Sequence, residues 1–528
     1  NGGSTNRGVN NCVLYVLPDT WDGDSRSNRD LGQDPVYTGV LTQASDQTLQ
    51  SLVLSETTRG RYVVMDIIDN HGGTAYVGMR SFYPYGSINK ADIESTVEDT
   101  VLTGRIHGDF VIAEKLEVPE RIVSQDPKDK VQITNFDEGI DGGAGTWIST
   151  GTGVVTKSTS TYFSGTGSVL IDTATDATAT SAKLTLASSV DLSAHETFRI
   201  GVKVEDDKKD AIDDVGGVVL KLDSASGQMV IDFSKYVIKL SEIGRIGNFD
   251  MSIKTGNGND RAGNEITTSG TFDISAVTDI TIEVKGKSGQ SSEIYFDNLF
   301  FFSTELDKGK IVLVWDDLSL TLKDEIMPIH SKYGFVGEIG FVGSVFLSTV
   351  SGGWNSDSSW LKQALLNGWR MANHCQSGTG WIDNENTDAL NYEWSENREI
   401  LRQEGLRDNY VMIYPDGRFD SNRLTVTDDH FRCARTTQFD GPRTVQWPPA
   451  EPMIMNAVRL SSATSLSDAQ AAVDHAEAEG SVQIFYCHYL TTGVAGVLSW
   501  NDSDYDSLLS YITTKNVDVT TLSDLYKS

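Results

Sequence analysis

The spacing of apolar residues changes along the chain, and each change marks a different kind of predicted structure. Residues 131–305 are rich in Thr, Ser, Gly and Asp, and they carry short runs in which apolar and polar residues alternate, as at 168–172 and 198–204. Alternation with a period of two is typical of half-buried strands. This middle segment is therefore predicted to be an all-β sandwich.

After Lys308 the pattern becomes one of apolar, strand-like runs that alternate with amphipathic, helix-like segments. The predicted strands are 311–315, 335–341, 410–414, 431–436 and 482–488. The predicted helices are 322–332, 358–367, 395–404 and 471–479, the last opened by a capping box at Ser467 and ended by Gly480. This alternation predicts a parallel α/β barrel or a doubly wound sheet.

The first part of the chain is less regular. Strand-like pieces at 12–17 and 61–68 alternate with polar turns, and 91–107 has helical spacing. An N-terminal domain that is β-rich or α+β is expected. The chain is therefore predicted to be multidomain, with domains at 1–130, 131–305 and 306–528.

Charge and composition narrow the function classes. The 528 residues include 43 Lys and Arg against 74 Asp and Glu, a formal net charge of -31. A nucleic-acid partner is not expected, because phosphate binding needs clustered cations. No stretch approaches the roughly 20 apolar residues of a membrane span. The four cysteines form no CxxC pair, so neither a zinc knuckle nor a disulfide framework is indicated.

The candidate chemistry lies where predicted strands of the last domain end. Asp316 and Asp317 follow the run 311–315, and two adjacent carboxylates there repel each other unless a cation or a proton is shared between them. His374 and His488 also follow strand-like runs. Because the carboxyl ends of parallel barrel strands face one common site, these side chains are expected to meet.

In the order of these motifs, residues 308–528 resemble the polysaccharide deacetylase family, also called the NodB-homology or family-four carbohydrate esterases. The run 311–317, ending in Asp316-Asp317, is similar to the first motif, and Asn373-His374 is similar to the start of the second. Tyr414-Pro415-Asp416-Gly417 is similar to the third. Arg435 and Asp440 stand where the fourth motif lies, and His488 matches the fifth.

The resemblance implies a deacetylase-like, distorted β/α barrel and a role for each matching residue. Asp316 would be the general base and His488 the general acid. Asp317 and His374 would hold a divalent metal, with zinc expected. Tyr414, Pro415 and Asp416 would form one wall of the cleft, with a backbone N–H near Asp416 donating to the oxyanion. Arg435 and Asp440 would orient the catalytic pair. The reaction implied is removal of acetyl groups from a glycan.

One motif departs from the family. A second metal-binding histidine is expected four residues after His374, and that position is Gly378. Cys375, Asp383, Glu385 or a water molecule could supply the missing ligand instead. The departure favours a different function class, a catalytically silent protein that uses the barrel only to bind glycans. A glycosidase would need two spaced carboxylates, and no such pair is evident.

The middle segment resembles jelly-roll carbohydrate-binding modules. It opens with Asn135-Phe136-Asp137-Glu138-Gly139 and closes with a strand-like run at 293–302, similar to the first and last strands of that family. Exposed aromatic residues on such a sandwich can stack on sugar rings, and Trp147 and Tyr162 are the candidates. Each of these rings could instead be buried in the core.

This order of domains resembles a virus tail fibre or tailspike. The resemblance implies a protein of the virion tail, or otherwise of the cell surface or the extracellular space. Its expected partners are a surface polysaccharide or glycoprotein glycan, and other tail proteins bound through the N-terminal domain. A homo-oligomer such as a trimer would follow, although no heptad pattern is present.

Overall fold

The structure is a computed structural model of the chain, and it divides into two compact units, Asn1–Glu120 and Arg121–Ser528. No helix among the described residues is long and apolar enough to cross a membrane. The described residues are 9–17, 37–40, 62–70, 102–107, 110–115, 127–136, 147–175, 178–205, 208–213, 215–240, 247–253, 266–319, 321–348, 358–377, 387–406, 410–437 and 444–526.

The described part of the first unit is a five-stranded antiparallel sheet with the order β2-β1-β3-β5-β4. The strands are β1 Val9–Leu17, β2 Tyr37–Val40, β3 Tyr62–Asn70, β4 Leu102–His107 and β5 Phe110–Lys115. The strands expected at 12–17 and 61–68 are confirmed. The helix expected at 91–107 is wrong over β4, because these residues pair antiparallel with β5; residues 91–101 lie outside the described residues.

The middle segment forms two antiparallel sheets, one with the order β15-β13-β12-β16-β10-β7 and one with the order β14-β11-β17-β9-β8, in which β6 also pairs with β17. The strands are β6 Lys130–Thr134, β7 Trp147–Thr150, β8 Val154–Ser158, β9 Ser168–Asp172, β10 Thr180–Val190, β11 Thr197–Val204, β12 Val218–Ser224, β13 Gly227–Asp232, β14 Gly247–Ser252, β15 Ile266–Gly270, β16 Val277–Val284 and β17 Glu293–Phe302. The predicted all-β character is confirmed. Its assignment to the jelly-roll class stays a prediction.

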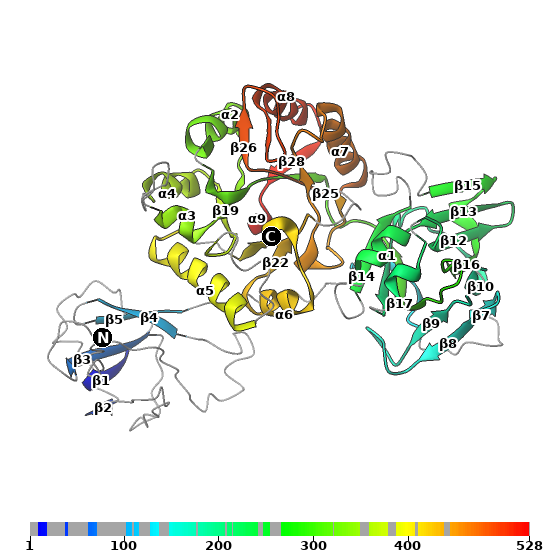
Figure 1. Ribbon diagram of the computed structural model, residues 1–528, viewed down its shortest axis with the longest axis horizontal. Helices are drawn as coiled ribbons and strands as arrows, with labels where there is room; N and C mark the ends of the chain where they lie inside the picture. The colour runs from blue at the N-terminus through cyan, green and yellow to red at the C-terminus, as the bar shows by residue number, and fades with distance from the viewer. Residues whose placement is uncertain are drawn as a thin grey trace. The chain divides into compact units, whose positions relative to one another are not determined.

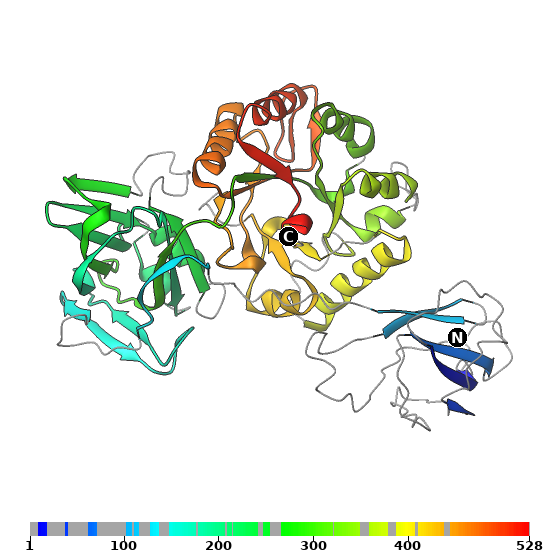
Figure 2. The same cartoon turned by 180° about the vertical axis from the view of Figure 1, so that it is seen from behind.

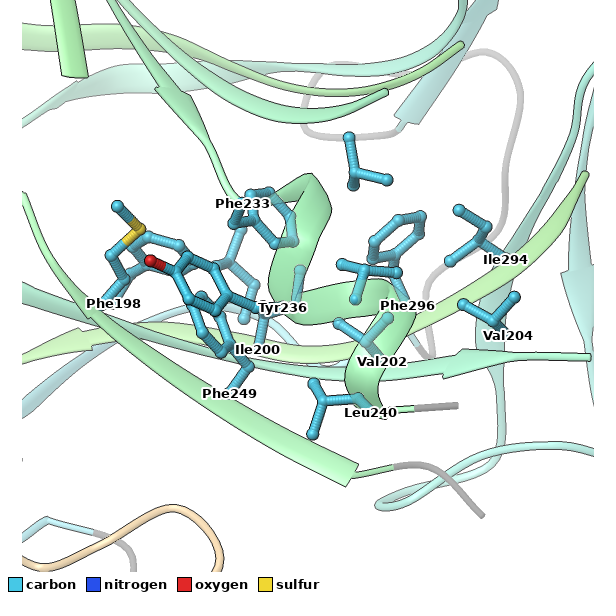
Figure 3. Packing of buried hydrophobic residues seen from close by; sticks show 14 of the residues in the cluster. Phe198, Ile200, Val202, Val204, Phe233, Tyr236, Leu240, Phe249, Ile294 and Phe296 are labelled. Atoms are coloured by element: carbon cyan, nitrogen blue, oxygen red, sulfur yellow. The ribbon is translucent and has the colours of Figure 1, made fainter. Parts of the chain in front are cut away.

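Apolar side chains between the two sheets make the core of this segment. Along β11 the residues Phe198, Ile200 and Val202 are fully buried. The short helix α1, Ser234–Leu240, packs onto β11 and β14, where the ring of Tyr236 stacks on Phe249 with ring centroids 5.1 Å apart. Figure 3 shows these side chains gathered against α1. Burial of such large rings contributes much of the apolar area that stabilises a sandwich.

The last part of the chain contains a nine-stranded sheet that curls into a half-barrel. The main order is β22-β21-β20-β19-β18-β25-β23, and all the neighbouring pairs from β22 to β25 are parallel. Residues 455–459 lie between β22 and β25, because Met455 bridges Arg435 of β22 while β24 pairs with β25. Its strands are β18 Gly309–Trp315, β19 Glu338–Phe341, β20 Arg370–Asn373, β21 Val411–Ile413, β22 Cys433–Arg435, β23 Thr444–Val445, β24 Val458–Arg459, β25 Val482–Cys487 and β28 Val517–Thr520. Two further strands, β26 Tyr489–Thr491 and β27 Ser499–Asn501, form a separate parallel pair.

Helices surround this barrel, as Figures 1 and 2 show from its two ends. They are α2 Met327–Tyr333, preceded by a π-helical turn at Leu322–Ile326, α3 Gly343–Leu347, α4 Ser359–Leu366, α5 Thr387–Gln403, α6 Ser421–His430, α7 Leu466–Glu479, α8 Asp502–Ile512 and α9 Leu522–Leu525. The predicted alternation of strands and helices is confirmed. The capping box is formed by Ser465 with Asp468, not by Ser467, and Gly480 ends α7 in the left-handed conformation as expected.

Candidate active site

Alternation along the barrel strands decides which side chains reach the candidate site. Val312 and Val314 of β18 belong to the apolar cluster inside the barrel, whereas Leu313 and Trp315 pack against the helices. Because successive strand residues point to opposite faces, Asp316 is on the inward face. The same parity applies to three other residues that follow an inward-facing apolar residue by two positions: His374 after Ala372, Arg435 after Cys433, and His488 after Tyr486.

The first aspartate, Asp316, is buried and paired with a cation. Both of its carboxylate oxygens accept hydrogen bonds from Arg435 Nη2, each at 2.6 Å. The guanidinium of Arg435 lies over the ring of Tyr486, 4.4 Å from its centroid. The pair is therefore held on one side by β22 and on the other by β25. The structure thus brings Arg435 to the carboxylate that it was expected to orient.

The second aspartate, Asp317, stands between two histidines. Its Oδ1 lies 3.2 Å from His374 Nε2, and its Oδ2 lies 3.6 Å from His488 Nε2. The Asp317 side chain is 49% exposed, so solvent reaches it. His374 Nδ1 lies 2.8 Å from the carbonyl oxygen of Ile413 and donates to it, because a carbonyl only accepts. Nε2 of His374 is thereby aimed at Asp317.

The charges in this cluster shift the pKa values of both partners. Burial alone would lower the pKa of His374, but its hydrogen bond to Asp317 and the nearby carboxylate charges raise the pKa above its ordinary value. Burial alone would raise the pKa of Asp317, but the hydrogen bond and charge of His374, with the charge of His488, hold it below the ordinary value. These opposite shifts favour an ion pair between the Asp317 carboxylate and a protonated His374.

Strained backbone gathers around the same residues. Four described non-glycine residues of the barrel have positive φ: Asp317 (64°), Leu318 (48°), Cys375 (63°) and Asp416 (52°). They lie in or beside the first, second and third predicted motifs. Such conformations persist only where the surroundings enforce them, and they cluster at functional sites. The left-handed backbone at Leu318 is a conformation that favours glycine.

The turn predicted as the third motif lies next to β21. Pro415–Gly417 forms a 3-10 turn in which Asp416 is exposed, while Tyr414 and Pro415 are buried. Burial also raises the pKa of Tyr414. Only Asp416 of this motif therefore offers a side chain to solvent, and a contribution from Tyr414 to substrate would come through its backbone.

One expected residue is not brought to the site, and four others lie outside the described residues. Cys375 is fully buried in an apolar cluster with Leu390 and Trp394, so it is not a candidate ligand. Asp383 and Glu385, which could also supply the missing ligand, lie outside the described residues. Gly378 and Asp440 lie outside them as well.

The two candidate sugar-stacking residues of the sandwich differ in their exposure to solvent. Trp147 is 1% exposed and stacks on Phe136 with centroids 5.0 Å apart, so its predicted role at the surface is wrong. Its alternation within β7 points the ring into the core. Tyr162 is 46% exposed, and the adjacent Phe163 is 42% exposed. The exposed aromatic pair is therefore Tyr162 and Phe163.

No family model matches the chain, and no curated protein matches it. Solved structures align with its C-terminal part. The structural neighbours are family-four polysaccharide deacetylases.

Three of these neighbours have low identity. The family-four esterase domain of a multidomain xylanase from the hindgut metagenome of Trinervitermes trinervoides is 14% identical, with 42% of this chain and 91% of that chain covered and a TM-score of 0.29. A mutant of the peptidoglycan deacetylase PdaC from Bacillus subtilis is 12% identical, with 42% of this chain and 91% of that chain covered and a TM-score of 0.30. A family-four acetyl xylan esterase from Clostridium thermocellum, in complex with cobalt, is 13% identical, with 41% of this chain and 90% of that chain covered and a TM-score of 0.28.

The donors present can be tested against the metal that the family resemblance implies. With Nδ1 of His374 donating to Ile413, a neutral His374 and the Asp317 carboxylate place two lone pairs against each other, which requires a cation or a further proton between them. Zinc binds histidine nitrogen and carboxylate oxygen at about 2.0 to 2.2 Å, and atoms 3.2 Å apart can both reach one ion. Among the described residues, no group of three or more His, Cys, Asp or Glu side chains is placed so that all could hold one metal ion. Asp317 and His374 thus fit as two protein ligands, with water or substrate in the other positions.

Tyr486 and the residues of α5 are the site residues that the sequence reasoning missed. Tyr486 lies two positions before His488 on an alternating strand, so the parity that selected His488 could have selected it as well. Glu393 and Asn397 of α5 contact the turn that carries His374, from 16 to 24 residues further along the chain. No local pattern marks a contact of that kind.

Proposed function

We propose that residues 306–528 remove acetyl groups from surface polysaccharide by metal-assisted hydrolysis. The observation that carries the proposal is the convergence, on the inward face of one barrel, of a buried Asp–Arg pair with a second carboxylate between two histidines. Carboxylates and imidazoles so arranged are the groups that a hydrolase needs for base, acid and metal.

The contacts suggest a catalytic role for each residue of the site. Asp316 is the base, because Arg435 fixes its carboxylate and a carboxylate has about four lone-pair sites, which leaves some for a water molecule. His488 is the acid that protonates the leaving amine or sugar hydroxyl, with its Nε2 on the site side of the ring. A divalent ion held by Asp317 and His374 would lower the pKa of its water and polarise the acetyl carbonyl.

The proposal is tested by acetate release from an acetylated polysaccharide or a chromogenic acetate ester, using metal-depleted protein and protein reconstituted with zinc, cobalt or manganese. Asp316→Asn should lower kcat by about 10²- to 10⁴-fold and leave metal affinity unchanged. Asp317→Ala should lower both. Absence of acetate release from the wild-type protein with every metal would refute the proposal.

Gly378 favours a second function, in which the barrel only binds glycans. A glycine has no side chain with which to hold a metal, and the described residues supply two ligands where the family resemblance implies three. The observation that would select this function is calorimetric binding of the polysaccharide by protein that is inactive and takes up no metal.

We infer from the order of the three parts that the chain serves in a virus tail. The support is that an N-terminal sheet precedes a β-sandwich with exposed Tyr162 and Phe163 and then the deacetylase-like barrel. The N-terminal unit would bind other tail proteins, and the chain would form a homo-oligomer such as a trimer. Light scattering on the purified chain, and mass spectrometry of purified virions, test these two statements; a monomer absent from virions contradicts both.

A further inference from the structure

The turn that carries His374 is held by helix α5, which lies outside the barrel. Glu393 of α5 places one carboxylate oxygen, Oε2, 3.1 Å from the backbone nitrogen of Gln376 and 2.7 Å from that of Ser377. Both N–H groups donate to it. A carboxylate that accepts two successive backbone N–H groups makes charge-assisted bonds and fixes the local backbone.

Two buried asparagines hold the residues on the other side of His374. Asn397 Nδ2 donates to Asn373 Oδ1 at 3.0 Å and to the carbonyl of Phe341 at 2.7 Å. Asn373 Nδ2 donates to the carbonyl of Trp394 at 3.0 Å. Asn373 and Asn397 are both fully buried. The residue before His374 is therefore tied to α5 through side-chain amides, as the residues after it are tied through Glu393.

The turn between these two anchors is strained. Cys375 has a φ of 63°, and its N–H donates to Asn373 Oδ1 at 2.9 Å. A non-glycine residue is unfavourable in this conformation unless its surroundings enforce it. The N–H bonds to Glu393 lie one and two residues further on, so they are part of what enforces it. Without them the turn can relax to an ordinary conformation.

We propose that Glu393 is a positioning residue that sets the direction of the His374 ring toward Asp317 through the backbone of residues 375–377. The inference rests on the proposed function in that it assigns His374 to the metal. Residues that hydrogen-bond to a metal ligand commonly contribute about 10- to 100-fold to metal affinity. Here the partner acts on the backbone of the ligand's turn, since the His374 ring itself is held by Ile413.

The test compares three variants of the full chain: Glu393→Ala, Glu393→Gln and the matched control Glu396→Ala. Glu396 is an exposed carboxylate on the same helix, so its removal changes charge and helix propensity alike. Cobalt(II) affinity is measured by calorimetry. Glu393→Ala should weaken it by about 10- to 100-fold and lower kcat with KM unchanged. Glu393→Gln should recover most of the loss, because an amide oxygen still accepts, and Glu396→Ala should match the wild type.

A second measurement needs no metal. Protein labelled with ¹⁵N in its eight histidines gives ring signals by NMR, and those of His374 should move in metal-free Glu393→Ala but not in Glu396→Ala. Unmoved His374 signals, or cobalt affinity and kcat equal to those of the control, would overturn the role of Glu393 while leaving the proposed function intact. A wild-type protein that neither binds cobalt nor releases acetate would refute the proposed function. The ring signals would still show whether Glu393 positions the His374 ring.

Discussion

A buried carboxylate at the far end of the barrel makes stability depend on pH in an unusual direction. Glu338 begins β19 and is fully buried; its Oε2 accepts from the N–H of Leu522 at 2.8 Å and its Oε1 from the hydroxyl of Ser523 at 2.6 Å. It therefore holds the start of α9, which Figures 1 and 2 place over the centre of the barrel. Burial raises the pKa of Glu338 from 4.5 to about 7 in spite of these bonds.

The sign and size of the effect follow from that pKa. Because the folded-state pKa lies above the unfolded value, the folded protein binds the proton more tightly, and the free energy of unfolding falls as pH rises from 4.5 through about 7. The difference of the two values corresponds to about 3 kcal/mol, at roughly 1.4 kcal/mol per pKa unit. Glu338→Gln imitates the protonated acid, with an oxygen to accept from Leu522 and an amide to donate to the Ser523 hydroxyl.

The assay is urea unfolding followed by tryptophan fluorescence at pH 5 and at pH 8.5. Glu338→Gln should be close to the wild type at pH 5 and more stable by about 2 to 3 kcal/mol at pH 8.5. Glu325→Gln, the same change at an exposed residue, should show no such difference. Other groups with raised pKa values are present in both proteins, so their effects on the free energy of unfolding cancel in the difference. A stability difference for Glu338→Gln that is the same at both pH values would refute the reasoning.

Three further predictions concern local structure. Ser465→Ala should cost about 1 kcal/mol in the free energy of unfolding, the usual value of an N-cap, and Ser467→Ala should cost little; equal losses by thermal unfolding would contradict the cap seen at Ser465. His330 is fully buried and its pKa is lowered to about 3 by burial, so its NMR ring signals should not titrate between pH 8 and pH 4.5. Gly417→Ala should cost about 1 to 3 kcal/mol, because φ is 66° and a Cβ would meet Thr437; an unchanged melting temperature would exclude that clash.

Much of the fold could be predicted because alternation along a strand is written directly in the sequence. The strand expected at 168–172 agrees with β9 at both ends, and the one at 311–315 lies within β18. The N-cap of α7 was missed because Ser465 and Ser467 both stand three residues before a polar residue, Asp468 and Gln470. Only the direction from which the chain enters the helix selects between them.

The site was predictable where it depends on strand ends and not where it depends on packing. Asp317, His374 and His488 come together because parallel strands bring their carboxyl ends to one edge. The burial of Trp147 depends instead on which face of β7 meets the other sheet. The bonds from Glu393 to the turn after His374 join segments that only the packing of α5 places side by side.

Trp315 and Gly378 differ in what they can contribute to the candidate site. Trp315 points outward to the helices, where its indole Nε1 donates to His330 Nε2 at 3.3 Å. Its polar atom is thus satisfied within the core, so Trp315 contributes to packing and not to the site. Gly378 stands where the family resemblance implies a metal ligand, and a glycine has no side chain with which to bind a metal. The chemistry of the barrel therefore depends on whether Asp317 and His374 hold an ion with the help of water, and metal content is the measurement on which the proposed function turns.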